Sequence, residues 1–336
     1  MIIVTGAAGF IGSQVVKALN QRGERAILAV DNLTKGDKFR NLVMLDIADY
    51  MDKTELLGRL QQLGKIDAVF HQGACSDTTG SDGRYMMNNN YNYSIHLLDF
   101  CQQQRIPLIY ASSAATYGNS STFKEDPRYE APLNVYGYSK WLFDQVVRRR
   151  LGATTAPIVG LRYFNVYGPG EAHKGRMASV SFHHMQQWQS QRQVRLFGAH
   201  NDWDAGEQQR DFIAVQDVAQ INCWMYEHPQ VSGIFNVGTG VAASFNQLAQ
   251  SVINAHLVRE GHKALSLESM QQQGLIQYLD FPEDLKGKYQ SFTQADITRL
   301  REAGCDYRFM PVAEGVEAYV SATIDPSEQS RHRSQI

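Results

Sequence analysis

The sequence predicts an α/β fold in which a doubly wound parallel sheet precedes a smaller, mixed C-terminal lobe. Two observations predict it. Over roughly the first 165 residues, short β-branched runs alternate with helical patterns, which is the order of elements in βαβ units. A glycine-rich turn, Gly6-Ala-Ala-Gly9-Phe-Ile-Gly12, joins the first such run to the first helical pattern, as in Rossmann-type folds.

The first half of the chain supplies strands and helices in regular alternation. Residues 2–4 form a wholly apolar run, which is typical of a strand buried on both faces of a parallel sheet. Residues 11–19 then carry apolar side chains at helical spacing. We expect further strands at residues 26–30, 43–45, 66–70, 106–110 and 158–161.

The pattern loosens after Gly170, and the later elements are scattered. We expect a strand at 233–237, helices near 245–257, 293–303 and 312–320, and a polar surface excursion at 259–273. The predicted domains are a Rossmann-type domain over 1–168, to which about 211–240 returns, and a substrate lobe over 169–324. Residues 325–336 are expected to form a disordered tail.

Composition excludes several functional classes. The chain has 336 residues, with 32 Lys and Arg against 34 Asp and Glu, so we expect neither nucleic acid nor a membrane as a partner. No apolar run is long enough to span a bilayer, and the first residues do not resemble a signal peptide. The four cysteines form no CxxC pair, which indicates reduced thiols in the cytoplasm. His183-His184 lacks a third ligand at metal spacing, so no metal site is expected.

The glycine-rich turn predicts a dinucleotide site. Its glycines let the backbone approach a pyrophosphate at the N-terminus of the following helix. Asp31 follows the third glycine by 19 residues, where a carboxylate commonly binds a ribose hydroxyl. Asp31 favours NAD, but Lys35 and Lys38 can neutralise a 2′-phosphate. The residues alone therefore leave NAD and NADP both open.

A tyrosine with a lysine four residues later predicts acid–base chemistry. Tyr136 and Lys140 share one face of a predicted helix. Lowering a phenol pKa by about 3 units requires roughly 4 kcal/mol, which the lysine ammonium and a positive nicotinamide ring can supply. Ser113 ends the fifth strand, at the edge of the sheet where ligands bind, and can hydrogen-bond the reacting oxygen. Without further context, the alternative is a tyrosine and a lysine on a solvated helix face.

Together, the segments TGAAGFIG, ASSAATYG, YGYSK and RYFNVYGPG resemble the extended short-chain dehydrogenase/reductase family over nearly the whole chain. Within that family, HQGACSDTT, PLNVYGYSK, HKGRMASV and LKGKYQSFTQAD resemble the epimerases that act on ADP-heptose. The resemblance implies a nucleotide-sugar epimerase that uses NADP, takes ADP-heptose as its substrate and forms a homo-oligomer, reported for these epimerases as a pentamer. Their product is a building block of the lipopolysaccharide core.

The resemblance also implies roles for residues at matching positions. Tyr136 and Lys174 match the two proton-transferring residues, and Lys140 and Ser113 complete the catalytic set. The cofactor positions match Gly6, Gly9, Phe10, Ile11, Gly12, Asp31, Asn32, Lys38, Lys53, Gln72, Gly73, Ala74, Cys75, Ser76, Asn89, Lys140, Val166 and Lys174. The substrate positions match Ser113, Asn165, Arg176, His183, Phe197, Gly198, Ala199, His200, Arg210 and Tyr289.

Some residues depart from the pattern, and two other functions stay open. The family leads us to expect glutamate at Gln72 and serine at Arg176, and the region 257–277 is longer than expected. A 4-epimerase fits the same chemistry. A 4,6-dehydratase does not, since Ala114 and Ala115 stand where such enzymes carry an Asp-Glu pair. A non-catalytic dinucleotide sensor is disfavoured by the intact tyrosine and lysine.

Overall fold

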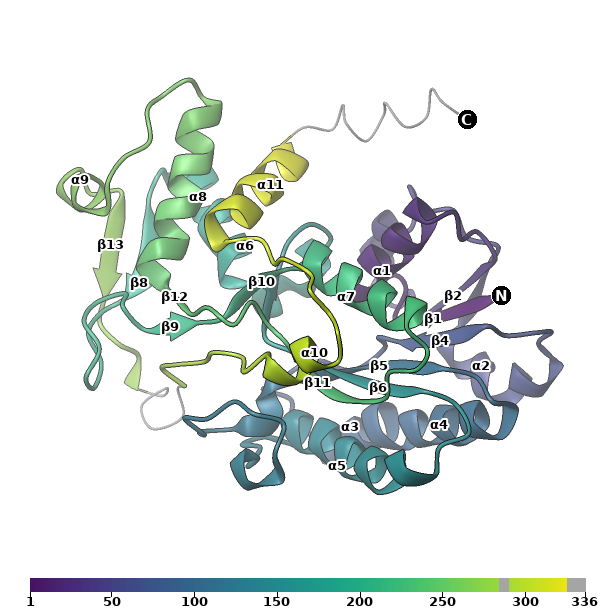
Figure 1. Cartoon of the computed structure of the whole chain (residues 1–336). Coiled ribbons are helices and arrows are strands. Elements are labelled where there is room, and N and C mark those ends of the chain that lie inside the picture. Colours follow the sequence, from purple (N-terminus) through teal and green to yellow (C-terminus); the bar gives the residue numbers. More distant parts are fainter. Residues whose placement is uncertain (284–289, 325–336) are drawn as a thin grey trace. The chain divides into compact units, whose positions relative to one another are not determined.

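The computed structural model describes residues 1–283 and 290–324, and these residues form two compact units. Unit 1 comprises Met1–Phe164, Val215–Val237 and Asp296–Tyr307. Unit 2 comprises Asn165–Ala214, Gly238–Ala295 and the residues from Arg308 onward. Figure 1 shows the elements of both units. No helix of the described residues is long and apolar enough to cross a membrane.

A seven-stranded parallel sheet forms the centre of the described part of unit 1, which confirms the predicted fold class. The strand order is β11-β6-β5-β4-β1-β2-β3. The chain builds one side outward from β1 and then returns to build the other side from β4. The carboxyl ends of β1 and β4 therefore meet at the point where the winding reverses, which is the usual ligand site of such sheets. The strands are β1 (Ile2–Thr5), β2 (Ile27–Asp31), β3 (Asp49–Asp52), β4 (Ala68–His71), β5 (Leu108–Ser113), β6 (Ile158–Tyr163) and β11 (Gly233–Val237).

Helices cover both faces of this sheet. Figure 1 shows α1 and α7 on one face and α4 and α5 on the other. The apolar runs predicted the buried strands because a parallel sheet that is covered on both sides leaves no face for polar side chains. The helices of unit 1 are α1 (Phe10–Gln21), α2 (Lys53–Arg59), α3 (Gly83–Met86), α4 (Tyr93–Gln104), α5 (Val135–Arg150), α7 (Val215–Glu227) and α10 (Thr298–Glu302). Short 3-10 turns are η1 (Gly36–Asn41), η2 (Leu60–Gln62), η4 (Ala114–Tyr117), η5 (Pro127–Tyr129) and η6 (Leu151–Ala153), and η3 (Met87–Asn92) is a π-helix.

The third predicted strand is wrong in position. Residues 43–45 lie in a turn, where Val43 is 53% and Met44 44% exposed, whereas β3 begins at Asp49. Strand β3 pairs with β2 at the sheet edge, and only Met51 of its four residues is buried. A strand at the sheet edge buries few side chains, so its sequence contains few apolar residues. The prediction therefore fell on residues 43–45, which are more apolar.

Unit 2 is built from three two-stranded sheets among its described residues, with helices packed beside them. Helix α8 packs against both α6 and α11. The strands are β7 (Asn165–Tyr167) with β10 (Phe212–Ala214), β9 (Gln209–Arg210) with β12 (Ala243–Ser244), and β8 (Val194–Phe197) with β13 (Ile276–Leu279). The helices are α6 (Val180–Gln191), α8 (Phe245–Arg259), α9 (Leu267–Gln272) and α11 (Val312–Ile324), with the 3-10 turn η7 (Ala172–Met177).

Two predictions about the later chain need correction. The polar stretch 259–273 is more than a surface excursion, because it contains α9, whose Met270 is fully buried in a cluster with Trp188 and Ile276. Residues 296–307 were assigned to the substrate lobe but belong to unit 1, where the Asp296 amide donates to the Phe123 carbonyl at 3.1 Å. The predicted tail, 325–336, lies outside the described residues.

Candidate active site

The glycine-rich turn of unit 1 forms a tight backbone cradle between β1 and α1. Gly6 has φ +70°, and a Cβ atom on it would lie 2.7 Å from the Cα of Gly73. A Cβ on Gly12 would lie 2.1 Å from the Gly6 carbonyl oxygen. Gly9 is the N-cap of α1 and has no side chain with which to cap the helix. Because the N-terminus of a helix attracts an anion, this cradle fits a dinucleotide pyrophosphate.

Asp31 is turned toward the protein's own loop. Its carboxylate is 6% exposed and accepts the amides of Ala8 at 2.8 Å and Asn32 at 2.7 Å. Lys38 forms an ion pair with the same carboxylate. Asn41 donates to the Ala8 carbonyl at 3.0 Å, so both backbone groups of Ala8 are held. The negative charge of Asp31 is therefore compensated within the chain.

Two further cofactor candidates meet beside the π-helix η3. The Lys53 ammonium, at the start of α2, donates to the Asn89 side chain at 2.6 Å. Asn90 is 1% exposed and holds the segment after β4, since its side chain accepts the Cys75 amide at 2.8 Å and donates to the Cys75 carbonyl at 2.9 Å. The sequence prediction missed Asn90. The sequence did contain a signal for it. Residues 88–90 are three consecutive asparagines, which are unfavourable inside a helix and therefore indicate another role.

Gln72 lies in a closed ring of hydrogen bonds. Its amide donates to Asn222 of α7 at 2.9 Å and accepts from the Tyr163 hydroxyl at 2.9 Å. Asn222 donates back to the Tyr163 oxygen at 2.9 Å. All three groups are neutral, and each acts as both donor and acceptor. The glutamine that departs from the expected glutamate thus has both a donor and an acceptor among its neighbours.

Tyr136, Lys140 and Ser113 come together at the carboxyl end of β5. Asn134 caps α5 by accepting the Gly137 amide at 2.8 Å, which starts the helix just before the tyrosine. The Lys140 ammonium is 4% exposed and donates to the Ala111 carbonyl at 2.7 Å. Burial lowers the pKa of Lys140 to about 8, while the nearby carboxylate of Asp144, one helical turn further on, opposes that shift.

The groups of the chain itself leave the pKa of Tyr136 above its ordinary value. Burial raises it, while a hydrogen bond with Ser113 lowers it only in part. Lys140 was expected to favour the phenolate, yet its ammonium is engaged by the Ala111 carbonyl. With only the chain's own groups around it, Tyr136 is therefore a neutral phenol at pH 7. Additional positive charge is needed to make it a base.

A buried ion-pair cluster supports this helix. The Arg162 guanidinium of β6 is fully buried and contacts Asp144 at 2.8 Å and Glu130 at 2.7 Å. The hydroxyl groups of Tyr110 and Ser112 donate to the same Asp144 carboxylate at 2.8 and 2.9 Å. Because removing one partner leaves a buried charge, the cluster fixes α5 against β5 and β6.

In unit 2, Lys174 lies in η7 and is half-buried. Burial lowers the pKa of Lys174, while the charge of Glu171 raises it. Glu171 is itself fully buried and accepts the Ser179 hydroxyl at 2.7 Å and the Gly168 amide at 3.2 Å. Residue type alone favours a solvated lysine, so this burial agrees better with the role implied by the resemblance.

The remaining substrate candidates also belong to unit 2. The His200 ring stacks on Phe281 with centroids 3.7 Å apart, and Phe197 meets the same ring edge-on at 5.4 Å. Arg210 is 8% exposed, and its guanidinium lies over the Phe245 ring at 5.8 Å. Asn165, Arg176 and Ala199 are exposed, whereas His183 and Gly198 are half-buried, as is the cofactor candidate Val166. Tyr289 lies outside the described residues.

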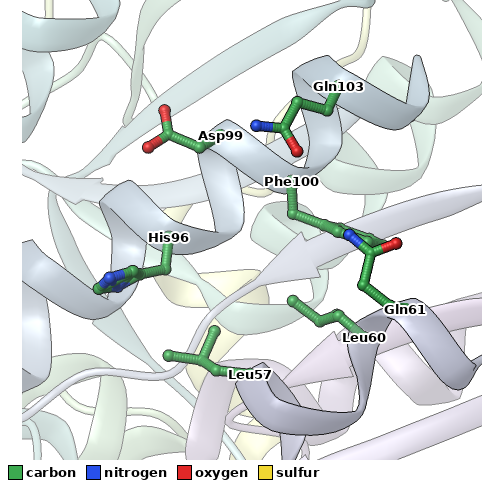
Figure 2. A pocket seen from close by; sticks show the side chains of 7 residues that line it. All are labelled: Leu57, Leu60, Gln61, His96, Asp99, Phe100 and Gln103. Carbon is green, nitrogen blue, oxygen red and sulfur yellow. The ribbon is translucent and has the colours of Figure 1, made fainter.

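A hollow in unit 1 is lined by none of these candidates. Figure 2 shows Leu57, Leu60 and Gln61 facing residues of α4. Its carboxylate, Asp99, is paired with Arg150 at 2.5 Å. No predicted site residue lines it. Among the described residues, no group of three or more His, Cys, Asp or Glu is placed to hold a metal ion.

Comparison with known proteins agrees with this geometry. The model of the NAD dependent epimerase/dehydratase family matches residues 2–238. The chain belongs to this family. An epimerase/dehydratase of similar structure is the ADP-L-glycero-D-manno-heptose-6-epimerase of Helicobacter pylori, at 30% identity and a TM-score of 0.78. The match covers 96% of this chain and 95% of that one.

Two other solved epimerases resemble the chain. One is the UDP-N-acetylglucosamine 4-epimerase of Methanobrevibacter ruminantium, at 25% identity and a TM-score of 0.78, covering 96% and 97% of the two chains. The other is the UDP-glucose 4-epimerase of Thermotoga maritima, at 25% identity and a TM-score of 0.75, covering 96% and 99%. The epimerase/dehydratase family is thus established, while its members differ in the sugar they act on.

Proposed function

We propose that this protein is an ADP-glycero-manno-heptose 6-epimerase that uses NADP. It interconverts ADP-D-glycero-β-D-manno-heptose and ADP-L-glycero-β-D-manno-heptose by transient oxidation at C6″ to a 6-keto sugar, for the lipopolysaccharide core. The observation that carries the proposal is the pair of half-buried proton-transferring candidates. Tyr136 stands in the tyrosine–lysine motif of unit 1, and Lys174 is half-buried in the HKG segment that resembles these epimerases.

The two residues suit an epimerisation. Hydrogen must leave one face of C6″ and return to the other, so two acid–base groups serve two orientations of the sugar. Tyr136 accepts the hydroxyl proton in one orientation, and Lys174 serves the other. Ser113, which lowers the pKa of the Tyr136 phenol, is placed to orient it. The bound dinucleotide supplies hydride acceptance and return, together with the positive ring that favours the phenolate.

The surroundings of Asp31 support NADP. A carboxylate that faces the ribose repels a 2′-phosphate. Here, the Asp31 carboxylate is occupied by two backbone amides and by Lys38. Lys38 therefore compensates the carboxylate charge that would otherwise repel a 2′-phosphate. Lys53 and Asn89, joined by a hydrogen bond, extend the polar lining of the cofactor site.

A 4-epimerase acting on a UDP-sugar is the second candidate, favoured by the two solved 4-epimerases at 25% identity. The deciding experiment incubates the purified protein separately with ADP-D-glycero-β-D-manno-heptose, UDP-glucose and UDP-N-acetylglucosamine and identifies the products by NMR. We expect the L-glycero epimer from the heptose and no change in either UDP-sugar. Conversion of a UDP-sugar alone refutes the heptose assignment and selects the alternative.

We also propose that the enzyme is a homo-oligomer, as the resemblance implies, with the pentamer as the specific form. Light scattering coupled to size-exclusion chromatography measures its mass directly. A mass of five chains supports this assembly, and a single chain of 37.8 kDa at micromolar concentration excludes it.

A further inference from the structure

A chain of buried hydrogen bonds joins β1, β4 and α4 in unit 1. The Gly73 amide donates to the Thr5 hydroxyl oxygen at 3.2 Å, and that hydroxyl lies 2.6 Å from Nδ1 of His71. Nε2 of the same ring lies 2.8 Å from the Ser94 hydroxyl oxygen. Ser94 donates to the Asn90 carbonyl at 2.5 Å. The side chains of Thr5, His71 and Ser94 each belong to residues that are 2% exposed, so water is excluded.

The two ends of this chain fix the direction of every donor. The Asn90 carbonyl only accepts, so the Ser94 proton points to it, and Ser94 must accept from Nε2–H of His71. At the other end, Thr5 accepts the Gly73 amide and uses its own proton toward Nδ1. The reverse tautomer would require Ser94 to donate twice. His71 is therefore a neutral ring with its proton on Nε2.

The surroundings of the ring oppose its second protonation. Burial and the Lys140 ammonium lower the pKa of His71 to about 3. The Tyr93 ring stacks on the imidazole with centroids 5.8 Å apart. A charged ring would donate from both nitrogens, and the Thr5 proton would then lose its acceptor. The donor order is thus permanent across the physiological pH range.

Both ends of the chain hold segments of the dinucleotide cradle. At one end, Gly73 packs against Gly6 so closely that neither can carry a Cβ without displacing the other or Thr5. At the other end, Asn90 holds both backbone groups of Cys75 and also donates to the Ser139 hydroxyl of α5 at 3.2 Å. The glycine-rich turn, the segment after β4 and the helix of Tyr136 are thereby joined.

We propose that His71, as the neutral Nε2–H tautomer, is a positioning residue that holds the glycine-rich turn and the segment after β4 in their cofactor-binding arrangement. It acts through Thr5 and Ser94 and contributes no group to the reaction. This inference rests on the dinucleotide binding in the proposed function, but not on the identity of the sugar.

The tautomer is tested on the wild-type protein without ligand. Nitrogen-15 NMR of labelled histidines reports the protonation of each ring nitrogen, and the His71 signals are assigned by contact with the Tyr93 ring. We expect an unprotonated Nδ1 and a protonated Nε2 that do not titrate between about pH 5 and 8. A proton on Nδ1, in either the neutral or the charged ring, overturns the proposal.

The positioning role is tested with a matched pair of variants. Thr5→Val removes the hydroxyl while keeping the branched shape, and Thr5→Ser retains the hydroxyl. We expect Thr5→Val to release NADP about tenfold faster in stopped-flow dissociation, and Thr5→Ser to stay near the wild-type rate. Equal release rates from the two variants overturn the role.

Tyr307→Phe controls for general loss of stability. It removes a hydroxyl that donates to Asp217 at 2.7 Å elsewhere in unit 1, and its NADP release should match the wild type. Faster release from this control as well shows a general stability effect and overturns the specific role. A wild-type protein that binds no dinucleotide refutes the proposed function. In that case, the nitrogen-15 NMR spectrum of His71 still tests the tautomer, because it needs no ligand.

Discussion

Lys140 remains charged inside unit 1, which lowers the folding stability. The size of this destabilisation depends on pH and can be measured. The side chain is 4% exposed, and burial lowers its pKa from 10.5 to about 8. Between these two values, the unfolded chain binds one more proton than the folded chain. Stability therefore rises with pH through this window, by about 1.4 kcal/mol per unit of pKa difference. The expected gain between pH 7 and 10 is about 2.5 kcal/mol.

The test compares urea unfolding of the wild type and Lys140→Met at pH 7 and at pH 10. Other titrating groups cancel in the difference between the two proteins. The Ala111 carbonyl loses its donor in the variant, but that cost is similar at both pH values. We expect the wild type to gain about 2.5 kcal/mol relative to the variant on going to pH 10.

The matched control is Lys17→Met, which removes an exposed lysine of α1. Its stability difference from the wild type should not change between the two pH values. If the stability difference between Lys140→Met and the wild type is also the same at both pH values, Lys140 is not held charged in a dry site. That result refutes the reasoning about its pKa.

Three further predictions concern catalysis, cofactor choice and the buried ion pairs. Tyr136→Phe and Lys174→Met should each slow epimerisation at least about a hundredfold with the dinucleotide still bound, because each removes a proton-transferring group. Turnover and cofactor stoichiometry check this, and full activity removes that residue from the mechanism. Lys38→Met should weaken NADP binding about tenfold more than NAD binding, because it leaves Asp31 uncompensated; calorimetry with both cofactors measures this, and equal losses refute it. Arg162→Met should cost about 3–5 kcal/mol in urea unfolding, since the buried Asp144 carboxylate loses its cation, and an unchanged midpoint contradicts that.

The sequence predicted the sheet because burial on both faces requires continuous apolar strands. Residues 2–4 and 158–161 fall within β1 and β6 for that reason. The same rule failed at β3, an edge strand with one buried residue, and at α9, a short helix with one fully buried methionine. Such elements depend on partners that are distant in sequence, which local patterns do not contain.

Local motifs also predicted much of the candidate site. Their residue types and spacing along the chain were enough to indicate the function of three features: the turn at Gly6–Gly12, the Asp31 carboxylate and the Tyr136–Lys140 pair. The ring formed by Gln72, Tyr163 and Asn222 has no such signature, because its members come from three separate segments. The contribution of burial to the Tyr136 pKa was not predicted, for a related reason. Burial depends on the assembled fold, whereas the helical spacing indicated only a neighbouring ammonium.

The central claim is that the hydrogen removed from C6″ returns to the same carbon from the cofactor. Incubation of ADP-D-glycero-β-D-manno-heptose with the protein in deuterated water, followed by NMR and mass spectrometry of the product, tests this directly. The account predicts the L-glycero epimer with ordinary hydrogen at C6″, because hydride held on the nicotinamide does not exchange with solvent. Deuterium at C6″ of the product, or heptose that remains unchanged, contradicts it.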